Sequence, residues 1–456
     1  MSFEDYLTSG RSGHLIGIGG VSMSPLGEVL SGMGLNIRGS DTRDSVNVEH
    51  LRALGIQIAI GHAAENIAPD TDFVVRTAAV HDDNVEVMEA RRRGIPVFER
   101  SEAWGAIMKD YKNALCISGT HGKTTTTSMS THIMMAAQRD PTVMIGGTLP
   151  LLHAGHRVGK GDTIILESCE YYNSFLKFSP TVAVILNIDN DHLDFFKDID
   201  DIKKSFRTFA ELVPPMGLVV ANMDDANTMD ALFGISRSVM TFGLTDAADF
   251  WARNIRFVGA TSEFDIMYQG RKFTHVSLRV PGMHNVKNAL AATAACVSLG
   301  AGPLAVKYGL SAFKGAGRRF EFKGKYNGAD IYDDYAHHPG ELRALLDAVE
   351  QLGYSRVVLA FQPHTYSRTK ALFNDFLTQL KRPQLAVIGE IYSARETNTD
   401  GISSRDLVNQ VPNAIYAPDL ESLEQTLRAI AAPGDIILTV GAGDIYRVGE
   451  RLAGEK

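Results

Sequence analysis

The sequence predicts an α/β protein of three domains, each built around a mostly parallel β-sheet. Its 456 residues suffice for about three domains of ordinary size. Short runs of Val, Ile and Leu alternate with helix-like stretches along the chain, which is the βαβ pattern of parallel sheets. Glycine-rich turns follow two of the predicted strands, where ligands commonly bind in this class of fold.

The composition fits an ordinary globular protein and excludes several other classes. Hydrophobic residues make up 45% of the chain and charged residues 21%. A net charge of −8 and a pI of about 6.0 argue against a nucleic-acid-binding surface. Cys116, Cys169 and Cys296 form no CxxC pair, so we expect free thiols in a reducing compartment. The N-terminus does not resemble a signal peptide and no apolar stretch is long enough to cross a bilayer, which predicts a cytoplasmic protein without membrane insertion.

The first domain is predicted to open with a strand at residues 14–18, followed by strands at 35–41 and 72–76. The turn after the first strand resembles a dinucleotide-binding fingerprint, and its candidate binding residues are Gly17, Gly19, Gly20, Val21, Ser22, Met23 and Ser24. Asp41 ends the second strand, where an acidic residue would meet a ribose. This motif predicts a nucleotide or diphosphate at a helix N-terminus, although tight strand–helix packing alone would explain the glycines equally well.

The second domain begins with the most specific motif of the chain. An apolar run at 114–118 leads into the residues Gly119, Thr120, His121, Gly122, Lys123, Thr124 and Thr125. Such a turn directs backbone N–H groups and a helix N-terminus toward a phosphate. Lys123 can reach the β- and γ-phosphates, and the hydroxyl of Thr124 can bind Mg²⁺. We therefore predict a nucleoside triphosphate site, although Ile117 stands where the standard pattern has its first glycine.

Two further groups follow the next predicted strands, at 163–167 and 182–187, whose continuous apolar runs suit strands buried on both faces. Glu167 ends the first of these strands and His192 follows the second. Because ligands bind beyond the carboxyl ends of parallel strands, both side chains would face the phosphate loop and could hold a second divalent ion. Without a role for His192, the same segment would simply cap a helix through Asp189 or Asp191.

Polar groups in the rest of the chain give weaker signals. Asn285 and Asn288 lie one helical turn apart, where their amides could read an adenine edge or cap the helix. A third domain is predicted from near Gly315 or Arg318, with strands at residues 356–361, 385–389 and 435–440. Its candidate residues are Arg318, Asp333, Tyr335, His337 and Arg368, whose guanidinium could bind a carboxylate through two hydrogen bonds.

Taken together and in this order, the motifs resemble the Mur ligase family of cell-wall peptide ligases, from Gly13 to about Arg447. The resemblance is carried by Gly-Thr-His-Gly-Lys-Thr-Thr, Asn-Ile-Asp-x-Asp-His, Gly-x-His-Asn-x-x-Asn, Gly-Arg-Arg-Phe and Asp-Asp-Tyr-x-His-His-Pro. It implies a Rossmann-like domain for a UDP-sugar at 1–110, a P-loop ATPase domain at 111–314, and a Rossmann-like amino-acid-binding domain at 315–456 that closes over the site.

Within the family, the motifs are most similar to those of members that join L-alanine to UDP-N-acetylmuramate for peptidoglycan synthesis. The implied reaction transfers the γ-phosphate of ATP to the lactyl carboxylate, and the amine of L-alanine then displaces phosphate from this acyl phosphate. A recycling ligase that attaches a preformed peptide to the same UDP-sugar stays open, as do a monomer and a homodimer. A nicotinamide-dependent dehydrogenase, suggested by the first motif alone, would leave the phosphate loop unexplained.

The resemblance also implies roles for individual residues. Lys123 would stabilise the transferring phosphoryl group, Thr124 would hold a first Mg²⁺, and Glu167 with His192 would hold a second, with Mn²⁺ able to substitute. The implied contacts to ATP from outside the loop are Asn285, Asn288, Arg318 (also implied in catalysis) and Asp333, and those to the amino acid are Tyr335, His337 and Arg368. Some alanine-adding relatives carry Arg at the position of Thr365, so one carboxylate contact differs here.

Overall fold

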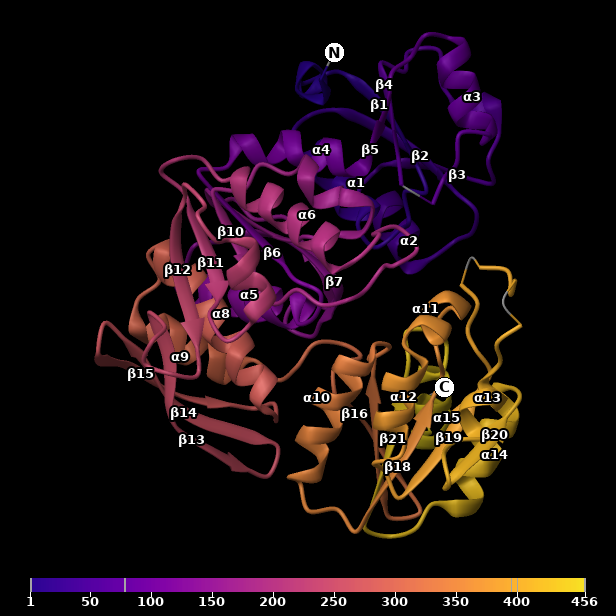
Figure 1. The fold of residues 1–456 in the computed structure, drawn as a ribbon. Coiled ribbons are helices and arrows are strands. Elements are labelled where there is room, and N and C mark those ends of the chain that lie inside the picture. Colours follow the sequence, from indigo (N-terminus) through magenta and orange to yellow (C-terminus); the bar gives the residue numbers. More distant parts are fainter. Residues whose placement is uncertain (1, 78, 395, 400, 455–456) are drawn as a thin grey trace.

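The structure, a computed structural model, describes residues 2–77, 79–394, 396–399 and 401–454. Its strands form three separate sheets that follow one another along the chain, and helices flank each sheet (Figure 1). The sheets are largely parallel, so the predicted α/β fold class is confirmed. In the part of the chain that the structure describes, no helix combines the length and the apolar character that crossing a membrane requires.

The first sheet has five parallel strands in the order β3-β2-β1-β4-β5, as in nucleotide-binding Rossmann folds. The strands are β1 (Ser12–Ile16), β2 (Asn36–Asp41), β3 (Gln57–Ile60), β4 (Phe73–Arg76) and β5 (Val97–Glu99). The helices are α1 (Met23–Gly32), α2 (Val46–Ala53), α3 (Val85–Arg92) and α4 (Arg100–Ile107), with short 3₁₀ turns at Phe3–Tyr6, Ala64–Asn66 and Met108–Asp110. The first strand ends two residues earlier than the sequence predicts, so the turn already begins at Gly17.

The central sheet has ten strands in the order β15-β14-β13-β12-β11-β10-β6-β9-β7-β8. Neighbouring strands from β13 to β7 in this order are parallel, whereas β8, β14 and β15 pair antiparallel in hairpins that the apolar runs did not predict. The strands are β6 (Asn113–Ser118), β7 (Thr142–Leu149), β8 (Ala154–Arg157), β9 (Thr163–Glu167), β10 (Val182–Ile185), β11 (Leu218–Asn222), β12 (Ser238–Gly243), β13 (Phe250–Val258), β14 (Thr261–Tyr268) and β15 (Arg271–Leu278).

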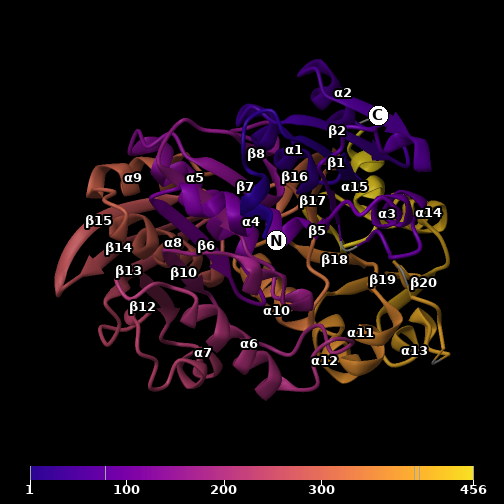
Figure 2. The same cartoon turned by 90° about the horizontal axis from the view of Figure 1, so that it is seen from above.

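Helices cover the central sheet on both faces. The helices are α5 (Lys123–Ala136), α6 (Ile199–Glu211), α7 (Ala226–Ala231), α8 (Met283–Ser298) and α9 (Pro303–Ala312), with a 3₁₀ segment at Tyr171–Lys177. Helix α5 packs against α8 and α9 (Figure 2). The buried aromatic side chains of α6 instead join the core that the central domain shares with the first domain.

The third sheet has six strands in the order β16-β17-β21-β18-β19-β20, parallel except for the β16–β17 pair. The strands are β16 (Glu321–Tyr326), β17 (Ala329–Asp334), β18 (Arg356–Phe361), β19 (Leu385–Gly389), β20 (Ala414–Ala417) and β21 (Asp435–Val440). The helices are α10 (Pro339–Glu350), α11 (Tyr366–Ala371), α12 (Phe373–Leu380), α13 (Ser404–Val408), α14 (Leu420–Ile430) and α15 (Tyr446–Ala453).

The hydrophobic cores divide the molecule differently from the sheets. One continuous core runs from the first domain into the central domain and contains Phe73, Trp104 and Phe206. Gly105 of α4 lies so close to the Lys177 carbonyl that a Cβ there would be 1.9 Å from its oxygen. The two cores of the third domain contain only residues from that domain. The first two domains therefore form one packed body, and the contacts to the third domain described below are mostly polar.

Candidate active site

The phosphate loop connects β6 to α5 and has the backbone that the sequence predicts. Gly119 and Gly122 have φ values of +138° and +85°. Positive φ values favour glycine, because glycine has no Cβ that would clash with the backbone. Gly122 is the N-cap of α5, and Lys123 is the first residue of the helix. The His121 N–H donates a hydrogen bond to Asn187 Oδ1 at 2.8 Å, which ties the loop to the segment following β10. The loop and the helix N-terminus are therefore held in a fixed geometry.

Lys123 lies at the centre of a buried polar network. Its Nζ donates to the Gly119 carbonyl at 2.6 Å and to both carboxylate oxygens of Glu170, at 3.0 and 3.2 Å. Burial alone would lower the pKa of Lys123, but the Glu170 carboxylate outweighs it and raises that pKa. Sequence reasoning did not assign a role to Glu170, although its position three residues after Glu167, just past a strand end, was the available signal.

Thr124 and Glu167, which the sequence assigns to two different metal ions, lie within hydrogen-bonding distance of each other. Thr124 Oγ1 donates to Glu167 Oε1 at 3.0 Å, and the Gly146 N–H donates to the other carboxylate oxygen at 2.6 Å. A hydroxyl and a carboxylate beside a phosphate loop are the hard oxygen ligands that Mg²⁺ prefers, so these residues fit the ion. His192 Nε2 instead lies 3.7 Å from Glu170, which therefore lies between Lys123 and His192.

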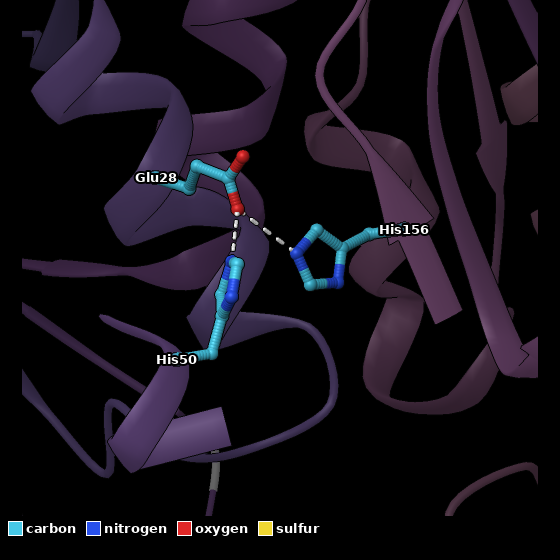
Figure 3. Close-up of side chains that lie close together, drawn as sticks. All are labelled: Glu28, His50 and His156. Carbon is cyan, nitrogen blue, oxygen red and sulfur yellow. Dashed lines mark hydrogen bonds and ion pairs between the residues drawn. The ribbon is translucent and has the colours of Figure 1, made fainter. Parts of the chain in front are cut away.

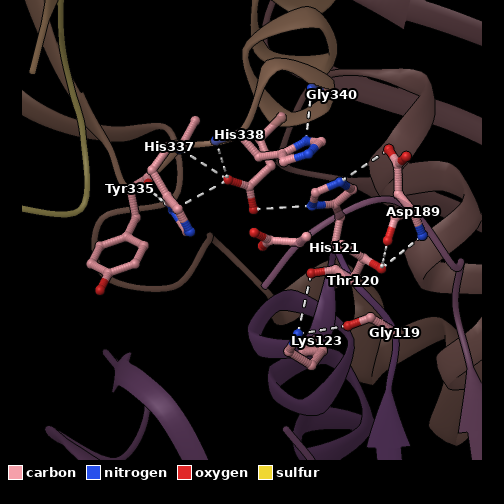
Figure 4. A network of polar contacts seen from close by, with 12 residues as sticks. Gly119, Thr120, His121, Lys123, Asp189, Tyr335, His337, His338 and Gly340 are labelled. Atoms are coloured by element: carbon pink, nitrogen blue, oxygen red, sulfur yellow. Dashed lines mark hydrogen bonds and ion pairs between the residues drawn. The ribbon is translucent and has the colours of Figure 1, made fainter. Parts of the chain in front are cut away.

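The phosphate loop also contacts the third domain (Figure 4). His121 Nδ1 lies 3.4 Å from the Glu341 carboxylate of α10, and its Nε2 lies 3.6 Å from Asp189. His338 Nε2 donates to the Asn190 carbonyl at 2.9 Å. Burial would lower the pKa of His121, but hydrogen bonds to Asp189 and Glu341 raise it to about 9. A charged imidazole on the loop therefore attracts a carboxylate of the third domain.

Residues predicted to bind the amino acid gather on the third-domain side of this interface. Arg368 donates through Nε and Nη2 to Asp191 Oδ1, at 3.0 and 2.8 Å. The His337 ring lies 5.5 Å from the ring of Tyr335 and 5.7 Å from that of His364, and its Nδ1–H donates to the Tyr335 carbonyl at 3.0 Å. Burial lowers the pKa of His337 to about 4, so its imidazole is neutral near pH 7.

A cavity of about 500 Å³ lies between the central and third domains. It is lined by Thr124, Thr125, Asn285 and Asn288, which the sequence predicts to bind ATP, and by Arg319 of the third domain. Sequence reasoning assigned no role to Arg319, because the neighbouring Arg318 was the residue matched to the family motif.

Arg318 does not line this cavity. Its Nε donates to Asp333 Oδ2 at 2.9 Å, and Nη1 and Nη2 donate to the carbonyls of Gly443 and Gly441. The guanidinium also lies over the rings of Tyr335 and Tyr446. Arg318 and Asp333 are thus paired with each other inside the third domain, and their contact with ATP stays a prediction.

The glycine turn of the first domain leads from β1 into α1. Gly17 has a φ of +77°, Ser22 is the N-cap of α1, and Ser24 and Met23 are buried in its first turn, whereas Val21 is exposed. The Gly20 N–H donates to the Gly17 carbonyl, closing the turn.

Two side chains contact this turn. Asp41 Oδ2 accepts the Gly19 N–H at 2.8 Å, so this carboxylate stabilises the turn in addition to any contact with a ribose. Arg100, at the start of α4, donates to the Ser22 hydroxyl. It places a cation beside the predicted diphosphate site. Sequence reasoning missed this cation, since Arg100 is distant along the chain.

The three sheets and the phosphate loop define the class of protein, and comparison with known proteins agrees. The chain matches the Mur ligase family catalytic domain at 13–112, the Mur ligase middle domain at 117–296 and the glutamate ligase domain of Mur ligases at 318–443. The chain belongs to the Mur ligase family, as the sequence motifs predict.

Individual relatives are similar over the full length. A protein of Caldanaerobacter subterraneus subsp. tengcongensis named UDP-N-acetylmuramate–L-alanine ligase is 45% identical over 447 residues, which are 97% of each chain. One of the same name from Agathobacter rectalis is 46% identical over 96% of this chain and 97% of its own. The crystal structure of the UDP-N-acetylmuramate-alanine ligase of Thermotoga maritima has a TM-score of 0.81 at 28% identity, covering 97% of this chain and 98% of that one.

Proposed function

We propose that this chain is an ATP-dependent ligase that joins L-alanine to the lactyl carboxylate of UDP-N-acetylmuramate, giving ADP and phosphate, in cytoplasmic peptidoglycan precursor synthesis. The observation that carries the proposal is the polar interface between the central and third domains. There His121 of the phosphate loop lies 3.4 Å from the Glu341 carboxylate, and Arg368 donates a hydrogen bond to Asp191 in the segment after β10. The full-length relatives with this activity in their names support it. The UDP-sugar would lie at the first-domain turn, with its diphosphate beside Arg100 and the N-terminus of α1.

In the first step, a lactyl carboxylate oxygen forms a bond to the γ-phosphorus of ATP while the bond to the ADP oxygen breaks. Lys123 would leave Glu170 in part to contact the transferring phosphoryl group, whose charge its ammonium neutralises. Thr124 and Glu167 would hold one Mg²⁺, and His192 with Glu170 or Glu167 a second. When bound, the ions neutralise the repulsion between carboxylate and phosphate.

In the second step, the amine of L-alanine forms a bond to the acyl carbon, and phosphate leaves with the pair of electrons of the C–O bond. Two N–H groups of Arg368 already bind Asp191. Arg368 would therefore bind the alanine carboxylate through N–H groups that Asp191 does not use. His337 is neutral, and its Nδ1–H is used by the Tyr335 carbonyl. Its Nε2 lone pair would accept the proton that the amine loses.

The experiment that tests the proposal measures phosphate release from ATP and Mg²⁺ in the presence of UDP-N-acetylmuramate, with single amino acids added in turn. Release that requires the UDP-sugar and is fastest with L-alanine, with a product of matching mass, is the expected result. Release only with a tri- or tetrapeptide would instead identify the recycling ligase. Release that does not depend on the UDP-sugar would overturn the assignment of the first domain.

A further inference from the structure

A second cluster of metal-binding side chains lies away from the phosphate loop, between the first and central domains (Figure 3). Glu28 of α1 accepts hydrogen bonds at one oxygen, Oε2, from His50 Nε2 at 3.0 Å and from His156 Nε2 at 3.1 Å. His50 belongs to α2 and His156 to β8, so the three residues come from three separate elements and two domains. The proposed function uses none of them.

The donor atoms already have the spacing of a metal site. The three ligand atoms lie within 4.8 Å of one another, and donors around a tetrahedral Zn²⁺ are about 3.3 Å apart. Two imidazoles and one carboxylate are a donor set that Zn²⁺ uses when the fourth position stays open. The Glu28 and His156 side chains are a quarter and a tenth exposed, so an ion could enter from solvent.

The Nδ1 atoms of His50 and His156 can carry the ring proton, which is the tautomer that metal binding through Nε2 requires. Each histidine would bind through an Nε2 lone pair and carry its proton on Nδ1. Among the described residues, the side-chain hydrogen bonds and ion pairs of His50 and His156 involve Nε2 and Glu28 alone. Moving the proton from Nε2 to Nδ1 would therefore break no other hydrogen bond.

A similar group at the active site lacks this freedom. His121, Asp189 and His338 also bring three donor atoms within 4.8 Å. However, His338 donates from Nε2 to the Asn190 carbonyl and accepts the Gly340 N–H at Nδ1, so neither nitrogen has a lone pair to offer. The contrast singles out the Glu28 cluster.

We propose that Glu28, His50 and His156 form a binding site for a divalent transition-metal ion of the Zn²⁺ type, which links the UDP-sugar domain to the ATPase domain. Glu28 lies on the helix whose N-terminus carries the glycine turn, so a bound ion would fix α1 against the β7–β8 hairpin. The site is distinct from the oxygen-rich Mg²⁺ site at Thr124 and does not depend on the identity of the amino acid.

The test measures binding of Zn²⁺ to the full-length chain by calorimetry, after chelator treatment and in millimolar Mg²⁺ that occupies the oxygen sites. Co²⁺ absorption spectra report whether nitrogen ligands surround the ion. The variants are His50→Asn and His156→Asn. His153→Asn is the matched control, because His153 lies in the same hairpin but outside the cluster. Melting curves without metal establish that each variant is folded.

The expected result is one Zn²⁺ per chain that binds more than about 100-fold more weakly in either cluster variant, since loss of a direct ligand should exceed the effect of losing an outer-shell partner. Zn²⁺ should raise the melting temperature of the wild type and of the His153 variant, but not of the cluster variants. Unchanged binding in the cluster variants, equal loss in the control, or absence of Zn²⁺ binding by the wild type would each overturn the proposal and leave the cluster as a hydrogen-bonded domain contact.

Discussion

Replacing Gly146 by alanine should disable the enzyme without unfolding it. A Cβ at this position would lie 2.6 Å from Glu167 Oε1 and 2.9 Å from Oε2. Ordinary van der Waals contact begins near 3.4 Å, so the carboxylate must move by about 0.8 Å. This motion would pull the Glu167 carboxylate away from Thr124, whose Oγ1 donates a hydrogen bond to Glu167 Oε1 at 3.0 Å. The oxygen atoms proposed to bind Mg²⁺ would then be misplaced by nearly 1 Å.

The size of the effect follows from this displacement. A misplacement of about 1 Å at a reacting centre costs on the order of 100-fold in rate, which corresponds to about 2.7 kcal/mol of transition-state stabilisation. Stability should change little, because the displaced atoms are the end of a flexible side chain. The φ of Gly146 lies outside the left-handed region, and alanine at such a site stabilises by about 0.4–1 kcal/mol through the unfolded chain.

The assay is kcat/KM for phosphate release with both co-substrates at a series of Mg²⁺ concentrations, together with a melting curve. Gly147→Ala on the same strand is the matched control, because its Cβ would meet only the Thr124 methyl, at 3.3 Å, and the Gly317 carbonyl. A Gly146→Ala enzyme whose kcat/KM stays within a few-fold of the wild type would refute the role of Glu167. A large drop in melting temperature would show that the site does not relax as described.

Three more outcomes are expected. Lys123→Met should lower the free energy of unfolding by about 3–5 kcal/mol, because it removes the ammonium group that pairs with the buried Glu170 carboxylate. Adding Glu170→Gln should restore stability in denaturant titrations, while phosphate release stays lost by about 10³-fold or more. Asp189 and Glu341 raise the pKa of His121 to about 9 in the folded state. The charged imidazole therefore contributes its full stabilisation below the unfolded pKa near 6.5, and this stabilisation is lost as the pH rises through about 9. Glu341→Gln should flatten the resulting decline in melting temperature with pH, and an unchanged slope would contradict the assignment. Removing divalent ions with a chelator should stop phosphate release, and Mg²⁺ or Mn²⁺ should restore it; release that continues in excess chelator would exclude a role for the ions.

Much of the fold and of the phosphate site was predictable because its signals are local. The strand at Thr163–Glu167 was predicted with its observed bounds, since a continuous apolar run bounded by polar residues has few alternatives in a parallel sheet. The loop before Lys123 was predicted because glycines, lysine and hydroxyl must be adjacent in the chain to surround one phosphate. The hairpins from β13 to β15 were not predicted, because alternating half-buried strands leave a weaker pattern.

By itself, the sequence determined the family, the three α/β domains and the residues of the phosphate loop, all of which are encoded in short adjacent segments. Only the tertiary structure showed that Glu170 pairs with Lys123, that Arg319 rather than Arg318 lines the cavity, and that His156 reaches Glu28 from another domain. These contacts join residues that are distant in the chain or depend on which way one side chain turns. They depend on how packed domains are oriented, and no local pattern of residues specifies that orientation.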